Sequence, residues 1–294
     1  MLEEKNKFII MGGPGRSGTS FVAQNLESHI QVCSFRDFEL KILCEFGGFV
    51  ELYRSLVTNF SPNRAEESLK TFCHIFSYLR QENVFQPASL ESFVSKVILD
   101  NLMLNLKKKI LNNGIPQKLN ELQFKNIMLN FLTDLSKTAY LKKPSSILFL
   151  EKTPHNLLQK EMINFLKSNS KFIHVYRNPM AIACSLVNQN WGPQNLESAI
   201  TWVKNYFDCW FDVKNFYNDE KIFIFDISLE EIMIDPKKIS LDICEYLKID
   251  LNDQLFQEVD ISLKDSWKLK LDKQSIKLLN NELDYIRKKL AFKN

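Results

Sequence analysis

Residues 7–20 read KFIIMGGPGRSGTS, an apolar run that passes directly into glycines and then into a helical pattern. The run predicts a strand at residues 7–12, and residues 17–29 have the spacing of a helix. A glycine-rich turn between a strand and a helix directs backbone N–H groups and the positive helix end toward a phosphate. We therefore expect a phosphate-binding loop here, and a glycine-rich turn without a ligand is the alternative.

The loop departs from the Walker A pattern GxxxxGK[ST] at one position. Gly13, Gly18 and Ser20 fit the pattern, but Thr19 stands in place of the lysine, and the nearest cation is Arg16. Kinases and ATPases need that lysine, with Mg²⁺, on the terminal phosphates. We expect the loop to bind a shorter anion chain, and a divergent P-loop kinase is the alternative enzyme.

Four further apolar runs predict strands at residues 30–35, 147–150, 172–176 and 221–225. Their apolar positions are mostly consecutive, which is typical of strands covered on both faces of a parallel sheet. Helical patterns alternate with these strands. The chain is thus predicted to have an α/β fold, a P-loop-like, doubly wound parallel sheet of about five strands.

Three helices are predicted to begin at a proline preceded by a capping residue, namely at Thr153–Pro154, Asn178–Pro179 and Asp235–Pro236. Residues 40–143 have a helical pattern throughout, broken near Ser61–Pro62, Gln86–Pro87 and Asn113–Gly114. This block is too long for a loop, so we expect a helical insertion within a single domain of residues 1–294.

The composition excludes several classes of protein. The 294 residues are 45% hydrophobic and 25% charged, as in soluble globular proteins, and the formal net charge of +3 does not indicate nucleic acid or membrane as a partner. Six cysteines form no CxxC pair and no Cys/His cluster, which predicts neither disulfides nor a metal site. We expect a cytoplasmic protein, either a monomer or a homodimer.

Two more segments place cations at predicted strand ends. Residues 172–179 read FIHVYRNP, so Arg177 ends a strand beside a helix N-terminus, and Ser185 lies about two turns into that helix. An arginine there suits a second phosphate. Residues 151–154 read EKTP and direct Lys152 toward the carboxyl-end crevice of the sheet. Taken singly, each also fits an ordinary strand-end arginine or surface lysine.

In this order, the three segments resemble the PAPS-dependent sulfotransferase superfamily, in its bacterial and tyrosylprotein-type branch. GPGRSGTS resembles the loop that binds the 5′-phosphosulfate of 3′-phosphoadenosine 5′-phosphosulfate (PAPS), and YRNPMAIACS resembles the 3′-phosphate segment. EKTP is a motif of that branch, and residues 228–236 and 262–268 resemble two later family segments. The resemblance implies a nucleotide-binding transferase that moves a sulfuryl group from PAPS to a hydroxyl or amine without a metal.

The resemblance also implies roles for individual residues. Arg177 and Ser185 would hold the 3′-phosphate, and Trp267 and Lys268 would belong to a loop that folds over the nucleotide. Arg16 and Lys152 would stabilise the bridging oxygen and the sulfonate. The loop that holds the 5′-phosphate would consist of Gly15, Arg16, Ser17, Gly18, Thr19 and Ser20.

Two positions depart from the family pattern. Leu229 stands where relatives often have an adenine-site tyrosine, and Gln189 stands where some have a second cation for the 3′-phosphate. Lys264 or Lys268 is a candidate replacement for that cation.

The catalytic base is sought in residues 32–39, VCSFRDFE. In the tyrosylprotein-type branch a catalytic carboxylate follows this strand, which implies Asp37. Glu39 would face the same side if the strand continued, so it is the second candidate. Pairing of either carboxylate with Arg36 or Lys41 is the structural alternative. The acceptor stays open among small molecules, carbohydrates and peptides, and a catalytically silent nucleotide-binding protein is a further alternative.

Overall fold

The computed structural model describes residues 7–36, 38–77, 80–81, 88–257, 259 and 266–291. The chain divides into two compact units. Unit 1 consists of Met1–Ile10 and Ile30–Ser170, and unit 2 consists of Met11–His29 and Lys171–Asn294. Among the described residues, no helix combines the length and the apolar character that a membrane crossing requires.

The central sheet has five strands in the order β2-β7-β1-β8-β9. Their bounds are β1 Lys7–Gly12, β2 Val32–Cys33, β7 Leu148–Lys152, β8 Ser170–Tyr176 and β9 Ile224–Ser228. The pairs β2/β7 and β8/β9 are parallel. Core residues fill consecutive strand positions, with Phe8–Met11 all at most 2% exposed. The predicted α/β class, with a parallel sheet of five strands, is confirmed.

The second and the last strand differ most from their predicted ranges, whereas β7 and β8 differ from theirs by at most two residues at either end. The second is only two residues long, and β9 begins three residues later than predicted. The delay arises because residues 220–222 end the preceding helix: Lys221 has φ 54°, and Ile222 N–H donates to the Tyr217 carbonyl at 2.8 Å. This is a left-handed helix terminus closed by an apolar residue, so the strand forms only after it.

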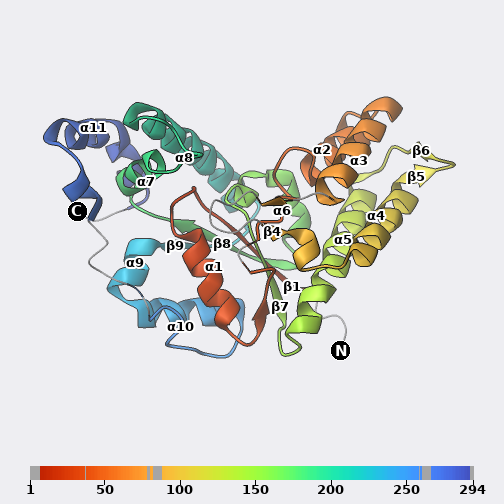
Figure 1. The fold of residues 1–294 in the computed structure, drawn as a ribbon, viewed down its shortest axis with the longest axis horizontal. Helices are drawn as coiled ribbons and strands as arrows, with labels where there is room; N and C mark the ends of the chain where they lie inside the picture. Colours follow the sequence, from red (N-terminus) through yellow and green to blue (C-terminus); the bar gives the residue numbers. More distant parts are fainter. Residues whose placement is uncertain are drawn as a thin grey trace. The chain divides into compact units, whose positions relative to one another are not determined.

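The helices of unit 1 are gathered beside one another in Figure 1. They are α2 Phe49–Tyr53, α3 Pro62–Ser77, α4 Lys96–Ile110, α5 Glu121–Lys142 and α6 Lys160–Leu166, with a π-helical turn at Arg54–Thr58 and 3₁₀ turns at Leu90–Ser92 and Asn156–Leu158. Their core is aromatic: the rings of Phe49 and Phe72 lie 4.9 Å apart, and Phe131 packs edge-on to both.

The prediction that residues 40–143 are helical throughout is wrong at two places. β3 (Arg80–Gln81) pairs with β4 (Ala88–Ser89), and β5 (Leu111–Asn112) pairs with β6 (Ile115–Pro116), both antiparallel. Asn113 and Gly114 form the second turn with φ 51° and 80°, the conformation that suits a two-residue hairpin. The predicted break near Gln86–Pro87 lies outside the described residues.

The helices of unit 2 follow its strands and loops. They are α1 Thr19–Ser28, α7 Pro179–Val187, α8 Leu196–Asp219, α9 Leu229–Ile234, α10 Pro236–Leu247 and α11 Lys273–Lys289, with a 3₁₀ turn η6 at Ser266–Lys270. Figure 1 shows α7, α8 and α11 packed together. The side chains of Asn178 and Asp235 cap α7 and α10 as predicted, each accepting a backbone hydrogen bond at 3.0 Å.

The helix predicted to begin at Pro154 instead begins at Lys160, after the 3₁₀ turn. The Thr153 hydroxyl is used elsewhere: it donates to Glu151 Oε1 at 2.7 Å and accepts from Lys41 N–H at 3.2 Å. Because the Thr153 hydroxyl makes these two hydrogen bonds, it does not cap a helix that begins at Pro154.

Candidate active site

The glycine-rich loop of unit 2 is fastened to the end of β8. A Cβ atom on Gly13 would lie 2.0 Å from the Val175 carbonyl oxygen, so no side chain fits there. Ser17 is fully buried; its hydroxyl donates to the same carbonyl at 2.9 Å, and its N–H donates to Pro14 O at 3.1 Å. The hydroxyl and the N–H of Ser17 therefore both stabilise the conformation of the loop.

The last part of the loop leads into α1. Gly18 is the N-cap of this helix at φ 96°, a conformation that favours glycine. Leu229 packs over it, 3.1 Å from the position of an added Cβ. Thr19 is buried and Ser20 is exposed in the first helical turn. The loop thus ends at a helix N-terminus, where backbone N–H groups attract anions.

Arg16 connects the two phosphate-binding segments predicted within unit 2. Its backbone has φ 71°, and its side chain is exposed with Nε donating to Ser185 Oγ at 3.1 Å. A non-glycine residue in this region costs roughly 1 kcal/mol. The bond to Ser185 holds the guanidinium over α7, so the structure brings Arg16 and Ser185 together.

Arg177 follows β8 and is partly buried. Burial lowers its pKa, Glu230 opposes that shift, and the nearby positive charge of Arg16 adds to it. Glu230 Oε1 also accepts a hydrogen bond from Asn178 N–H at 3.0 Å. Arg16 and Arg177 together with Glu230 give a net positive charge after the end of β8, which favours a bound anion.

The other nucleotide-site residues predicted in unit 2 lie around α7. Trp267, in η6, is 5% exposed, and its indole Nε1 has no hydrogen-bond partner among the described residues. Lys268 Nζ lies 5.7 Å from the Trp267 ring, and η6 packs against α7. The Gln189 side chain donates to the Ser185 carbonyl at 3.2 Å, so it is hydrogen-bonded to the last turn of α7. Lys264 lies outside the described residues.

Lys152 and Glu39 meet inside unit 1. Lys152 ends β7 and is 5% exposed, and its Nζ donates to Glu39 Oε1 at 2.7 Å. The structure thereby brings together two of the predicted catalytic residues. The predicted base Asp37 lies outside the described residues.

Comparison with known proteins identifies the family. The sequence pattern of the sulfotransferase family matches residues 8–253. The chain belongs to the sulfotransferase family. The predicted resemblance is confirmed at this level, and sulfuryl transfer is the chemistry of the family. No curated protein matches this sulfotransferase.

One solved structure shows the same fold, and a second solved chain is similar to this one. A sulfotransferase domain from the olefin synthase of Synechococcus PCC 7002 is 16% identical, with a TM-score of 0.52 and 93% of each chain covered. A sulfotransferase domain from the curacin biosynthetic pathway is 14% identical, with a TM-score of 0.48 and coverage of 93% of this chain and 96% of that one. At 16% identity, the likeness to the olefin synthase domain concerns the fold alone.

Sequence reasoning gave no role to Glu151, the neighbour of Lys152. Its carboxylate is fully buried and accepts hydrogen bonds from Thr153 Oγ1 and Asn156 Nδ2. Burial raises its pKa to about 7, against these hydrogen bonds, and the charge of Glu39 adds to the rise. The signal in the sequence was its place within EKTP, directly before the lysine.

Trp191 is a second residue that sequence reasoning left without a specific role. It is 50% exposed, stands edge-on to the partly exposed Trp202 with ring centroids 6.2 Å apart, and lies 3.9 Å from an added Cβ on Gly15. An exposed aromatic pair therefore borders the phosphate loop. Within the described residues, no group of three or more His, Cys, Asp or Glu side chains is placed to hold a metal ion.

Proposed function

We propose that this sulfotransferase uses PAPS as its donor and transfers the sulfuryl group to a hydroxyl or amine by in-line displacement, without a metal ion. The observation that carries the proposal is the 3.1 Å bond between Arg16 and Ser185, with Arg177 electrostatically coupled to Arg16. It supports two adjoining anion subsites, one at the loop and one at α7. A donor with separate 5′ and 3′ phosphates needs both.

The two arginines Arg16 and Arg177 have distinct roles in the proposal. Arg177 and Ser185 bind the 3′-phosphate, because a partly buried guanidinium forms strong paired hydrogen bonds to phosphate. Arg16 and the amides at the start of α1 bind the 5′-phosphate. As the bond between sulfur and the phosphate oxygen breaks, that oxygen takes the electron pair, and Arg16 stabilises its growing charge.

The acceptor chemistry belongs to unit 1 in this proposal. Glu39 takes the proton from the acceptor hydroxyl as the acceptor oxygen forms the new bond to sulfur. The 2.7 Å contact with Lys152 supports Glu39, because it holds this carboxylate in one place. Lys152 stabilises the transferring sulfonate. Asp37, the first candidate from the sequence, lies outside the described residues and is the alternative base in this proposal.

The test compares adenosine 3′,5′-bisphosphate with ADP in thermal-shift titrations that contain EDTA. We expect the bisphosphate to raise the melting temperature at concentrations at least about tenfold lower than ADP, because only it fills both subsites. Arg177→Ala should remove this preference. Lys237→Ala removes an exposed cation from the same unit and should keep it.

Two outcomes would contradict the proposal. Equal stabilisation by ADP and the bisphosphate would remove the argument for a 3′-phosphate subsite and favour a kinase-like nucleotide site. A preference that survives in Arg177→Ala would place the 3′-phosphate elsewhere.

A further inference from the structure

The end of β7 carries a cluster of buried polar side chains to which the proposed function assigns no role. Glu151, Thr153 and Asn156 are each at most 3% exposed. Polar groups this deeply buried need hydrogen-bond partners, and the bonds in turn fix the side chains in place. Lys152, which the proposed function uses, stands between the first two in the sequence. The cluster is therefore directly joined to the proposed site.

The Thr153 hydroxyl connects Glu151 with a distant backbone N–H. It donates its only proton to Glu151 Oε1 at 2.7 Å, which leaves a lone pair to accept from Lys41 N–H at 3.2 Å. Asn156 Nδ2 donates to the other oxygen of the Glu151 carboxylate. This carboxylate is thus held by two donors, and it determines the direction in which the Thr153 hydroxyl points.

The segment at the far end of this link carries Glu39. Residues 38–41 belong to no helix or strand, so their position depends on individual contacts. The Glu39 carboxylate is 18% exposed and accepts from Lys152 Nζ at 2.7 Å. Lys41 is only two residues from Glu39. The bond from Lys41 N–H to Thr153 therefore holds the backbone of this segment against the end of β7, where Lys152 lies.

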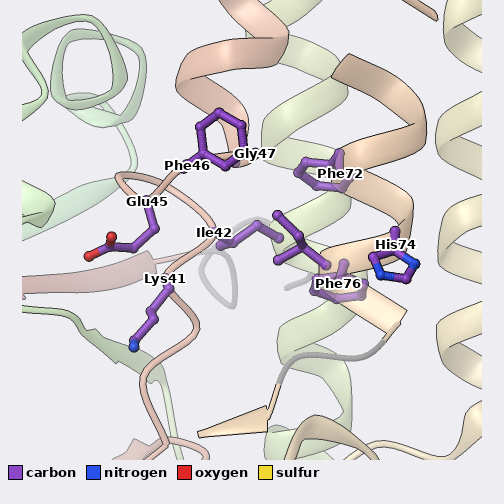
Figure 2. Close-up of a pocket in the computed structure, with 10 residues that line it drawn as sticks. Lys41, Ile42, Glu45, Phe46, Gly47, Phe72, His74 and Phe76 are labelled. Atoms are coloured by element: carbon purple, nitrogen blue, oxygen red, sulfur yellow. The ribbon is translucent and has the colours of Figure 1, made fainter. Parts of the chain in front are cut away.

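The residues after Lys41 make one further contact with the same part of the chain. Figure 2 shows that the side chains of Lys41 and Glu45 leave the loop on one side and that of Ile42 on the other. Glu45 Oε1 lies 3.5 Å from His155 Nδ1, but both side chains are 43% exposed. Because solvent screens an exposed pair, the buried Thr153 hydroxyl is the stronger of the two restraints.

We propose that Glu151 and Thr153 are positioning residues, which hold Glu39 against Lys152 in the geometry that the transfer requires. The inference rests on the proposed function, because it concerns the base and a cation of the same reaction. A displacement of about 1 Å at a reacting group can lower the rate about 10²-fold. Loss of the Thr153 hydroxyl would release the segment that carries Glu39 from β7, and the reaction would slow for that reason.

The first test measures how strongly Glu39 and Lys152 interact. Glu39→Gln, Lys152→Met and the double variant form a double-mutant cycle, and urea denaturation gives the coupling free energy of the pair. Thr153→Val removes the hydroxyl and keeps the shape of the side chain. When the cycle is repeated in this background, we expect at least about half of the coupling to be lost. A purely structural role would lower stability and leave the coupling unchanged.

Two matched variants serve as controls for the cycle. Thr153→Ser keeps the hydroxyl and should keep the coupling. Thr138→Val removes another buried hydroxyl of unit 1, which donates to the Leu135 carbonyl at 2.8 Å within α5, and should also keep it. Unchanged coupling in Thr153→Val, or no coupling in the wild type, would overturn the proposal.

Two further backgrounds extend the cycle. Thr153→Ala removes the same hydroxyl without placing a methyl group against the Glu151 carboxylate, and it replaces Thr153→Val if that variant does not fold. Glu151→Leu removes the acceptor of the hydroxyl and should lose the coupling as well. Coupling that is kept in Glu151→Leu would overturn the role of Glu151.

The second test measures turnover of labelled PAPS with water as the acceptor. The water oxygen forms the bond to sulfur, the phosphate oxygen takes the electron pair of the bond that breaks, and Glu39 takes the proton. We expect Thr153→Val to lower kcat for sulfate release at least about tenfold, with KM for PAPS changed less than about twofold. Thr153→Ser should restore most of the turnover. An equal fall in Thr138→Val, or a change confined to KM, would contradict positioning.

Calorimetry with adenosine 3′,5′-bisphosphate separates this inference from the proposed function. Bisphosphate binding by the wild type, with unchanged coupling in Thr153→Val, would contradict the positioning role alone. Loss of the coupling in Thr153→Val, without any bisphosphate binding by the wild type, would support the positioning of the pair and contradict the proposed donor.

Discussion

Two adjacent buried residues at the end of β7 differ in the charge of their partners. Lys152 is paired with Glu39, whereas Glu151 is fully buried among neutral hydrogen-bond donors. A carboxylate with a raised pKa is held in its protonated form over a wider pH range when the protein is folded. This difference makes Glu151 a source of pH-dependent stability.

The expected pH dependence follows from the sign of that shift. The pKa of Glu151 rises from 4.5 to about 7, so its contribution is fully present below pH 4.5 and is lost as the pH rises through about 7. Glu151→Gln cannot titrate. The free energy of unfolding of the wild type should therefore fall, relative to that of Glu151→Gln, by up to about 1.4 kcal/mol per pH unit in this window.

Urea denaturation between about pH 5 and pH 8 checks this prediction. Glu66→Gln, which removes an exposed carboxylate of the same unit, should track the wild type across the range. A constant difference between the wild type and Glu151→Gln would show that Glu151 does not titrate there.

The choice between Glu39 and Asp37 is also decided at single residues. Glu39→Gln keeps the shape of the side chain and removes its basicity, so kcat should fall by about 10²-fold or more while affinity for adenosine 3′,5′-bisphosphate is retained. Steady-state kinetics with labelled PAPS, next to calorimetry with the bisphosphate, measure the two effects. Loss of turnover in Asp37→Asn, with Glu39→Gln still active, would identify Asp37 as the base.

At the scale of elements, the phosphate loop lies in direct contact with the backbone of β8. Gly13 lies against a backbone carbonyl of β8, and the Ser17 hydroxyl bonds to the same carbonyl. By contrast, no atom of the described residues, its chain neighbours aside, lies within 4 Å of a Cβ added to Gly114 in the β5–β6 turn, where φ is 80°. The two glycines separate the effect of a backbone clash from that of a left-handed conformation alone.

Alanine at these positions should have unequal costs. Gly114→Ala should lower the free energy of unfolding by about 1 kcal/mol, the cost of a left-handed conformation. Gly13→Ala adds a clash with the backbone of β8 and should cost at least about 3 kcal/mol, or prevent folding. Urea denaturation of both variants measures the costs, and similar values would mean that β8 moves aside freely.

At the scale of the whole molecule, the proposed machinery divides between the two compact units. Arg16, Arg177 and Ser185 belong to unit 2, whereas Lys152 and Glu39 belong to unit 1. The family pattern spans both units but ends at residue 253, before α11. This helix packs on α7 and α8, and α7 carries Ser185 of the proposed nucleotide site.

The sequence by itself was enough to predict the fold class, the family and the order of the motifs. These depend on local patterns: consecutive apolar residues, a glycine-rich turn, and capping residues before prolines such as Asn178–Pro179. The structure that a local pattern predicts forms where the side chains involved have no competing partner elsewhere in the chain.

Tertiary structure decided the features in which distant residues share a partner. The Thr153 hydroxyl bonds to Glu151 and to Lys41 N–H instead of capping a helix at Pro154, and no local pattern contains Lys41. The Lys152–Glu39 pair and the Arg16–Ser185 bond join residues 113 and 169 positions apart. Burial and hydrogen bonding between such residues depend on the folded chain, because only folding brings their polar groups within reach and excludes water from around them.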